Sequence, residues 1–84
     1  MKTGSVVYSK SGHDLNETYA VIGFDKKGYV ILADDKRRPL DKPKIKNPKH
    51  LRYVGQDIPE LTEKLEQGKL KDSDLIWFLK PYQN

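Results

Sequence analysis

Cysteine is absent from the 84 residues, and there are only two histidines, His13 and His50. Without thiols the chain forms neither disulfides nor thiolate metal sites. Two histidines also fall short of the three or four ligands that a zinc site requires. We therefore expect no metal ion and no cofactor. A chain of this length has room for one hydrophobic core and not for a second independent one.

Long apolar runs are also lacking. No apolar stretch reaches the roughly 18 residues that a membrane-spanning helix needs, and residues 1–4 lack the apolar run of a signal peptide. These absences favour a cytoplasmic protein without a membrane partner. Apolar residues make up 36% of the chain and charged residues 33%. Because the apolar residues come in short patterned runs, we interpret the chain as folded.

Positive charge is concentrated in one segment. The formal net charge of the chain is +4. Residues 1–35 carry four basic and five acidic side chains, and residues 53–84 carry four basic and six acidic ones. Residues 36–52 carry eight basic side chains against Asp41 alone, a net charge of +7. The sequence therefore indicates a mildly acidic scaffold with one strongly basic segment.

Short strands are predicted in the first part of the chain. Runs of β-branched and aromatic residues between turn residues favour strands over residues 6–8, 18–24 and 29–33, and further short strands are expected near residues 36–40 and 50–54. Pro39, Pro43 and Pro48 exclude a long helix in the basic segment. Five short strands linked by tight turns are typical of a small closed or half-closed β-barrel, which we expect over residues 1–55.

Residues 56–84 are expected to form a C-terminal helical hairpin. Asp57, Pro59 and Glu60 resemble a capping box with proline in the first turn, which opens a helix that ends near Gln67. A second helix is predicted over residues 72–80, with Pro81 beyond its end. The predicted fold class is therefore mainly β with an α-helical tail.

An apolar stripe runs along one face of the second predicted helix. Leu75, Phe78, Leu79 and Tyr82 have the i, i+3, i+4, i+7 spacing of one helical face. We expect this face to pack within the hairpin or against the barrel. Ile76 and Trp77 lie outside the stripe, so a protein contact through the C-terminal helices stays open as an alternative.

The basic segment is the strongest functional signal in the chain. Lys42, Lys44 and Lys46 alternate, so in an extended chain they project from one side at about 6–7 Å intervals, the reach between backbone phosphates. A solvated charge run is the alternative interpretation, but single-signed charge spaced by prolines favours a polyanion. RNA is favoured over duplex DNA because no segment resembles a recognition helix for the major groove.

No arrangement of catalytic residues emerges. Asp34 and Asp35 are adjacent and would point to opposite faces of a strand, whereas Asp72 and Asp74 lie at a helix start, where acids favour the dipole. Signatures of an activated nucleophile or a phosphate-binding loop are not visible. We therefore expect a protein that is not an enzyme.

Two stretches of the chain resemble the KOW motif. The first is residues 4–14 followed by Tyr19, Ala20, Val21 and Ile22, and the second runs from Tyr29 through Arg38 to Leu51. They are similar to small bacterial KOW-domain RNA-binding proteins related to large-subunit ribosomal proteins of archaea and eukaryotes. The resemblance covers residues 4–54. It implies an SH3-like β-barrel, a ribosomal or other structured RNA as partner, and no catalysis.

The resemblance also implies a role for the first loop, whose small residues let the backbone approach RNA. Asn16 stands about where KOW motifs carry glycine, and asparagine tolerates a positive φ better than other non-glycine residues. Combined with the basic segment, this loop gives the following predicted RNA-binding residues: Lys10, Ser11, Gly12, His13, Lys36, Arg37, Arg38, Lys42, Lys44, Lys46, Lys49, His50 and Arg52.

The sequence thus predicts a non-catalytic RNA-binding protein with ribosomal RNA, and also ribosomal proteins, as partners. A protein-interaction module is the chief alternative, because SH3-like barrels bind peptides in aromatic grooves and four tyrosines lie in the predicted barrel. Contact with the transcription machinery is a further alternative, since KOW domains also occur in elongation factors.

Overall fold

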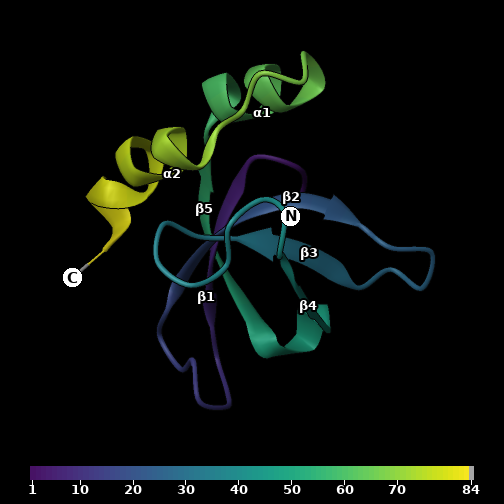
Figure 1. Ribbon diagram of the computed structural model, residues 1–84. Helices are drawn as coiled ribbons and strands as arrows, with labels where there is room; N and C mark the ends of the chain where they lie inside the picture. The colour runs from purple at the N-terminus through teal and green to yellow at the C-terminus, as the bar shows by residue number, and fades with distance from the viewer. Residues whose placement is uncertain (84) are drawn as a thin grey trace.

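The computed structural model describes residues 1–83 and contains five strands, two α-helices and two short 3₁₀ helices (Figure 1). The chain order is β1 (Ser5–Ser9), β2 (Thr18–Phe24), β3 (Val30–Ala33), β4 (Lys44–Lys46), η1 (Pro48–His50), β5 (Leu51–Asp57), α1 (Pro59–Glu66), α2 (Asp72–Leu79) and η2 (Lys80–Tyr82). The predicted fold class, mainly β with helices at the C-terminal end, is confirmed at this level.

The five strands form one antiparallel sheet in the order β4-β3-β2-β1-β5. β1 lies beside both β2 and β5, with Val7 opposite Tyr19 on one side and Tyr53 on the other. The register shifts between Val21 and Gly23 in β2 and between Ser5 and Val7 in β1, as at β-bulges, which bend a sheet and increase its twist. Within residues 1–83 no pairing joins β4 to β5, so the sheet is open.

The fourth strand was predicted at the wrong place. Residues 36–40 do not form a strand; the chain bends there, and β4 begins only at Lys44. The carboxylate of Asp34 causes the bend, because its Oδ1 accepts hydrogen bonds from the backbone N–H groups of Lys36, Arg37 and Arg38. A backbone that donates three times to one side chain cannot also donate to a neighbouring strand.

The core has two parts, because the two faces of the sheet are both covered. Val7, Tyr19, Val21, Val30, Leu32 and Leu51 form one buried cluster. Val6, Ala20 and Ala33 form the other together with Leu61 of α1 and Leu75 and Leu79 of α2. Alternate residues of a strand face opposite sides, which is why Val6 and Val7 enter different clusters.

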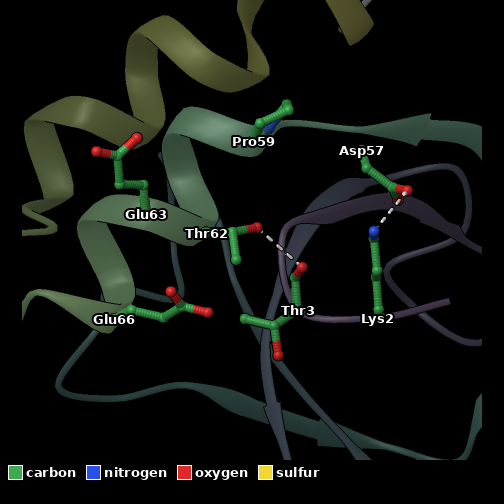
Figure 2. A pocket seen from close by; sticks show the side chains of 7 residues that line it. All are labelled: Lys2, Thr3, Asp57, Pro59, Thr62, Glu63 and Glu66. Atoms are coloured by element: carbon green, nitrogen blue, oxygen red, sulfur yellow. Dashed lines mark hydrogen bonds and ion pairs between the residues drawn. The ribbon is translucent and has the colours of Figure 1, made fainter.

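The helices are therefore part of the core. The apolar stripe was expected to pack within the hairpin or against the barrel segment, and it does both, because Leu75 and Leu79 share one buried cluster with Leu61 of α1 and with residues of β1, β2 and β3. Leu75 and Leu79 are fully buried, whereas Trp77 is 72% exposed and Ile76 51% exposed. An ion pair of 3.1 Å between Lys64 and Asp74 links α1 to α2. Helix α1 is fixed to the chain start by a hydrogen bond of 3.0 Å from Thr62 Oγ1 to the Thr3 carbonyl oxygen (Figure 2).

The predicted capping box at α1 was wrong. The helix begins after Ile58 with no side-chain cap, and Pro59 stands in the first turn as expected. Asp57 instead belongs to β5, where its carboxylate accepts hydrogen bonds from Ser5 Oγ at 2.7 Å and from the Tyr53 hydroxyl at 2.9 Å. At α2 the Asp74 carboxylate accepts a hydrogen bond of 3.0 Å from the N–H of Lys71, the residue before the helix.

Among the residues that the structure describes, none of the helices has the length and apolar character needed to cross a bilayer.

Candidate nucleic-acid interface

The loop between β1 and β2, residues 10–17, is tightly closed on itself. The N–H groups of Asn16 and Glu17 donate to the carbonyl oxygens of Ser9 and Asp14, both at 2.9 Å. Gly12 and Asn16 have positive φ values of 87° and 68°. The expectation that asparagine adopts the left-handed conformation in this loop is confirmed.

A polar network fixes this loop to β4. The Asp14 carboxylate accepts hydrogen bonds from Lys46 Nζ at 2.7 Å, the Tyr19 hydroxyl at 2.7 Å and Ser9 Oγ at 2.9 Å. Its second oxygen also forms an ion pair of 3.1 Å with Lys44 Nζ. The Asp14 side chain is only 12% exposed, so these four partners replace most of its contact with water.

The network shifts the ionisation of two of its members. Burial opposes ionisation of Asp14, but the hydrogen bonds from Lys46, Tyr19, Ser9 and Lys44 outweigh it and lower the pKa of the carboxyl well below its usual value of 3.8. Burial raises the pKa of the Tyr19 hydroxyl far above its usual value, and the hydrogen bond to Asp14 adds to the rise. Asp14 is therefore a carboxylate and Tyr19 a neutral donor throughout the neutral range.

Two arginines are presented by the bend that follows β3. Asp34 is buried and holds the backbone of residues 36–38 by the three hydrogen bonds described above. Its carboxylate therefore faces inward, whereas the side chains of Arg37 and Arg38 are exposed. Neither arginine forms an ion pair with any residue in the range 1–83.

The first loop and the basic segment meet in a surface hollow of about 290 Å³. Its lining residues are His13, Asp14, Tyr19, Arg37, Arg38 and Lys44. Three permanent cations and one histidine thus surround a single space, with Asp14 as the one acid among its lining side chains. Lys36 also approaches the loop, since its Nζ lies 3.9 Å from the Glu17 carboxylate.

On its other side the first loop contacts η1. The Lys10 N–H donates to the His50 carbonyl oxygen at 2.7 Å, which places Lys10 next to Lys49 and His50. Arg52 lies opposite Tyr8 in the β1–β5 register, and its guanidinium stands 5.3 Å from the centre of the Tyr8 ring. The loop is therefore flanked by both ends of the basic segment.

The predicted RNA-binding residues differ in how far their side chains are exposed to solvent. The exposed ones are Lys10, Gly12, His13, Lys36, Arg37, Arg38, Lys42, Lys49 and Arg52, and the half-buried ones are Ser11, Lys44, Lys46 and His50. Most of them contact the first loop or line the hollow beside it. No hydrogen bond or ion pair within residues 1–83 joins the loop to Lys42, Lys49 or Arg52, and none of the three lines the hollow; Lys42 lies in a turn where its N–H donates to the Pro39 carbonyl oxygen.

One shared direction was predicted for Lys42, Lys44 and Lys46. Lys44 and Lys46 have it, since both reach Asp14, whereas Lys42 lies in the turn before β4 and not in an extended strand. The prediction missed Asp14 itself, together with Ser9 and Tyr19, as the partners on that side. Only the alternation of the lysines was visible in the sequence, and it gives the side on which they project without indicating what lies opposite. We call residues 10–13 of the loop, together with residues 36–38, 44 and 49–52 of the basic segment, the cationic rim.

Other polar groups of the chain have structural partners. Asp72 Oδ1 accepts a hydrogen bond of 2.8 Å from the Leu40 N–H, and Asp74 accepts one of 3.0 Å from the Lys71 N–H. A hollow of about 490 Å³ near α1 is lined by Lys2, Thr3, Asp57, Pro59, Thr62, Glu63 and Glu66 (Figure 2). No group of three metal-ligating side chains gathers within residues 1–83.

The position of the rim is clear from the overall arrangement. The β1–β2 loop projects from one end of the molecule, α1 lies at the opposite end, and the β2–β3 hairpin points away to the side (Figure 1).

A scan against protein-family models gave no match for this chain, and a search of curated proteins found no relative.

Proposed function

We propose that the protein is a non-catalytic RNA-binding protein of the KOW type that contacts ribosomal or other structured RNA through the cationic rim. One observation carries the proposal. The first loop is flanked on one side by Arg37, Arg38 and Lys44, which line the hollow beside it, and on the other by His50, whose carbonyl oxygen accepts a hydrogen bond from the Lys10 N–H. His13 of the loop and three basic side chains of the 36–52 segment thus line one surface hollow.

The chemistry of the rim suits a phosphate backbone. Arginine guanidinium groups donate in a planar fork that matches phosphate oxygens, and lysines add point charges. Such contacts provide affinity and orientation but little sequence specificity. The exposed backbone at Gly12, which has no side chain to hold a partner away, allows a close approach.

The fold is consistent with this assignment. We propose that the curved sheet is an SH3-like barrel whose gap lies between β4 and β5, which η1 connects. The antiparallel order β4-β3-β2-β1-β5 and the buried cluster centred on Val7 and Leu32 support this arrangement.

Peptide binding in an aromatic groove has less support. Tyr19 is buried in the core, and the Tyr8 hydroxyl donates to the Tyr82 carbonyl oxygen at 2.8 Å. Of the four tyrosines in the barrel segment, Tyr29 and Tyr53 remain exposed, at the β2–β3 hairpin and on β5. Tyr29 precedes β3 and Tyr53 lies on β5, and within residues 1–83 these two strands are not paired with each other.

The test compares two double variants with the same loss of charge. Arg37→Ala/Arg38→Ala removes two cations from the rim, and Lys26→Ala/Lys27→Ala removes two exposed cations from the β2–β3 hairpin. Binding of a fluorescein-labelled RNA stem–loop is followed by anisotropy across a salt series. We expect the rim variant to reduce the log–log salt slope by about two and the hairpin variant to leave it near the wild-type value. Equal effects of the two variants would mean that net charge alone attracts the RNA.

A further inference from the structure

Lys44 and Lys46 are neighbours on one side of β4, yet their surroundings differ. Both ammonium groups contact Asp14, Lys44 at 3.1 Å and Lys46 at 2.7 Å. The side chain of Lys44 is 26% exposed and lines the hollow that also contains Arg37 and Arg38. The side chain of Lys46 is 11% exposed and does not line that hollow.

All hydrogen atoms of the Lys46 ammonium group are used inside the protein. The group has three N–H donors, and Nζ has three acceptors, namely Ser9 Oγ at 2.7 Å, the Ser11 carbonyl oxygen at 3.0 Å and Asp14 Oδ1 at 2.7 Å. A phosphate could bind Lys46 only by breaking one of these bonds. Lys44 makes one polar contact, with Asp14, and its side chain is 26% exposed, so it retains N–H donors for a partner.

The three acceptors of Lys46 fix the shape of the first loop. Ser9 is the last residue of β1, and Ser11 and Asp14 lie on the two sides of Gly12. Ser9 Oγ also lies 2.9 Å from both the Ser11 carbonyl oxygen and Asp14 Oδ1, which joins the acceptors to one another. The loop that bears Gly12 and His13 is thus folded around the end of a lysine from β4.

We propose that Lys46, Asp14 and Ser9 form an internal lock that holds the first loop in its binding shape, and that of the two lysines only Lys44 contacts phosphate. Lys46 is a positioning residue in this account. The inference rests on the proposed RNA-binding function, because the loop is held in shape for that partner. Preorganisation of this kind strengthens binding by removing the entropic cost of ordering the loop.

The salt dependence of RNA binding separates the two lysines. Lys44→Met and Lys46→Met each remove one charge from the same strand and keep the length of the side chain. For a fluorescein-labelled RNA stem–loop we expect Lys44→Met to reduce the salt slope by about one. We expect Lys46→Met to leave the slope unchanged while lowering affinity about tenfold at every salt concentration, because the loop has to be ordered on binding.

Hydrogen exchange at the loop gives an independent measurement. The N–H groups of Asn16 and Glu17 are bonded within the loop, so their exchange by NMR reports its order. We expect exchange at least about tenfold faster in Lys46→Met and unchanged in Lys44→Met. A reduced salt slope in Lys46→Met with wild-type exchange would overturn the inference and make Lys46 a phosphate contact.

Ser9→Ala tests the lock without any change of charge. Ser9 is buried and cannot itself contact RNA. We expect Ser9→Ala to weaken RNA binding and to speed hydrogen exchange in the loop, with the salt slope unchanged. Wild-type affinity together with wild-type exchange rates would refute the lock. If the wild-type protein does not bind RNA, the proposed function fails, but the exchange rates in Ser9→Ala and Lys46→Met still decide whether the lock exists.

Discussion

Single buried polar side chains determine how the first loop is held. The negative charge of Asp14 is stabilised by Lys46 and Lys44, and its carboxylate oxygens also accept hydrogen bonds from Tyr19 and Ser9. Breaking a buried ion pair by removing one partner leaves an uncompensated charge, which is usually strongly destabilising. The network therefore contributes to the stability of the fold as well as to the shape of the loop.

Replacement of Asp14 tests this contribution. We expect Asp14→Ala to lower the free energy of unfolding by about 3 kcal/mol, because Lys46 loses its charged acceptor while it remains almost buried. Urea denaturation at neutral pH measures the difference. A change below about 0.5 kcal/mol would mean that the pair contributes little.

The loss of unfolding free energy in Asp14→Ala should depend on pH, and the lowered pKa of Asp14 determines the sign of that dependence. The pKa of Asp14 is lower in the folded state than its usual value of 3.8, so the unfolded chain takes up the proton first as acid is added. The stability that the Asp14 carboxylate contributes is complete at pH values above the usual pKa of 3.8 and is lost as the pH falls toward the lowered pKa of the folded state. The gap in unfolding free energy between wild type and Asp14→Ala should therefore narrow below pH 3.8, and a constant gap would contradict the shift.

A glycine fixes the contact between the chain start and α1. Gly4 has a φ of 91°, and a Cβ atom added there would overlap the Thr62 hydroxyl. Its carbonyl oxygen also accepts the Ile58 N–H at 2.9 Å, just before α1 begins. A side chain at this position has no space and an unfavourable backbone conformation at the same time.

Two alanine substitutions separate these effects. Gly28 has a φ of 84° with nothing within 4 Å of an added Cβ, so Gly28→Ala should cost roughly 1–2 kcal/mol from the backbone alone. Gly4→Ala should cost about 3 kcal/mol or more, because overlap with Thr62 is added to the same backbone term. Equal losses in urea denaturation would show that the contact with α1 relaxes without cost.

At the scale of elements, the two helices stabilise the sheet by covering one face of it. Leu61, Leu75 and Leu79 are fully buried in the cluster that contains Val6, Ala20 and Ala33. These residues of β1, β2 and β3 would otherwise be exposed to water. The helices are thus required for the core of a small sheet, which would bury too little apolar surface by itself.

Substitutions on opposite sides of α2 test this role. Leu75→Ala should lower the free energy of unfolding by about 3 kcal/mol, since it leaves a cavity between α2 and the sheet. Trp77→Ala removes a larger side chain that is 72% exposed, and the change should stay within about 0.5 kcal/mol. If Trp77→Ala were the more destabilising of the two in thermal or urea unfolding, the packing described here would be wrong.

Elements with strong local patterns were predictable from the sequence. The run from Thr18 to Phe24 gives β2 with the expected bounds, and the spacing of Leu75 and Leu79 gives the buried face of α2. The bend at residues 36–38 was not predictable in this way, because it is set by one buried carboxylate, Asp34, which accepts three backbone N–H groups. Local propensity carries no information about such a contact.

The candidate site was predictable in composition but not in geometry. The basic segment and the first loop were both identified, and the structure brings most of their residues around the loop. The sequence treats Lys44 and Lys46 alike, whereas the fold places Asp14 and Ser9 against them and gives them different numbers of acceptors. Such differences arise from contacts between residues far apart in the chain, which alternation alone does not reveal.

At the scale of the whole molecule, charge is divided between two ends. The cationic rim includes residues 10–13 of the first loop, and α1 at the opposite end carries Glu60, Glu63 and Glu66 against Lys64 alone. A polyanion would be attracted to the end that carries the rim, which orients the protein before contact. The account therefore depends on several rim cations acting together on phosphates.

The salt dependence of RNA binding by the wild-type protein tests this claim most directly. The observed association constant for a structured RNA is measured by anisotropy over a range of salt concentrations. If about five phosphates are engaged, the log–log slope should be about −3.5 to −4.5. A slope near zero, or no binding at low salt, would contradict the account.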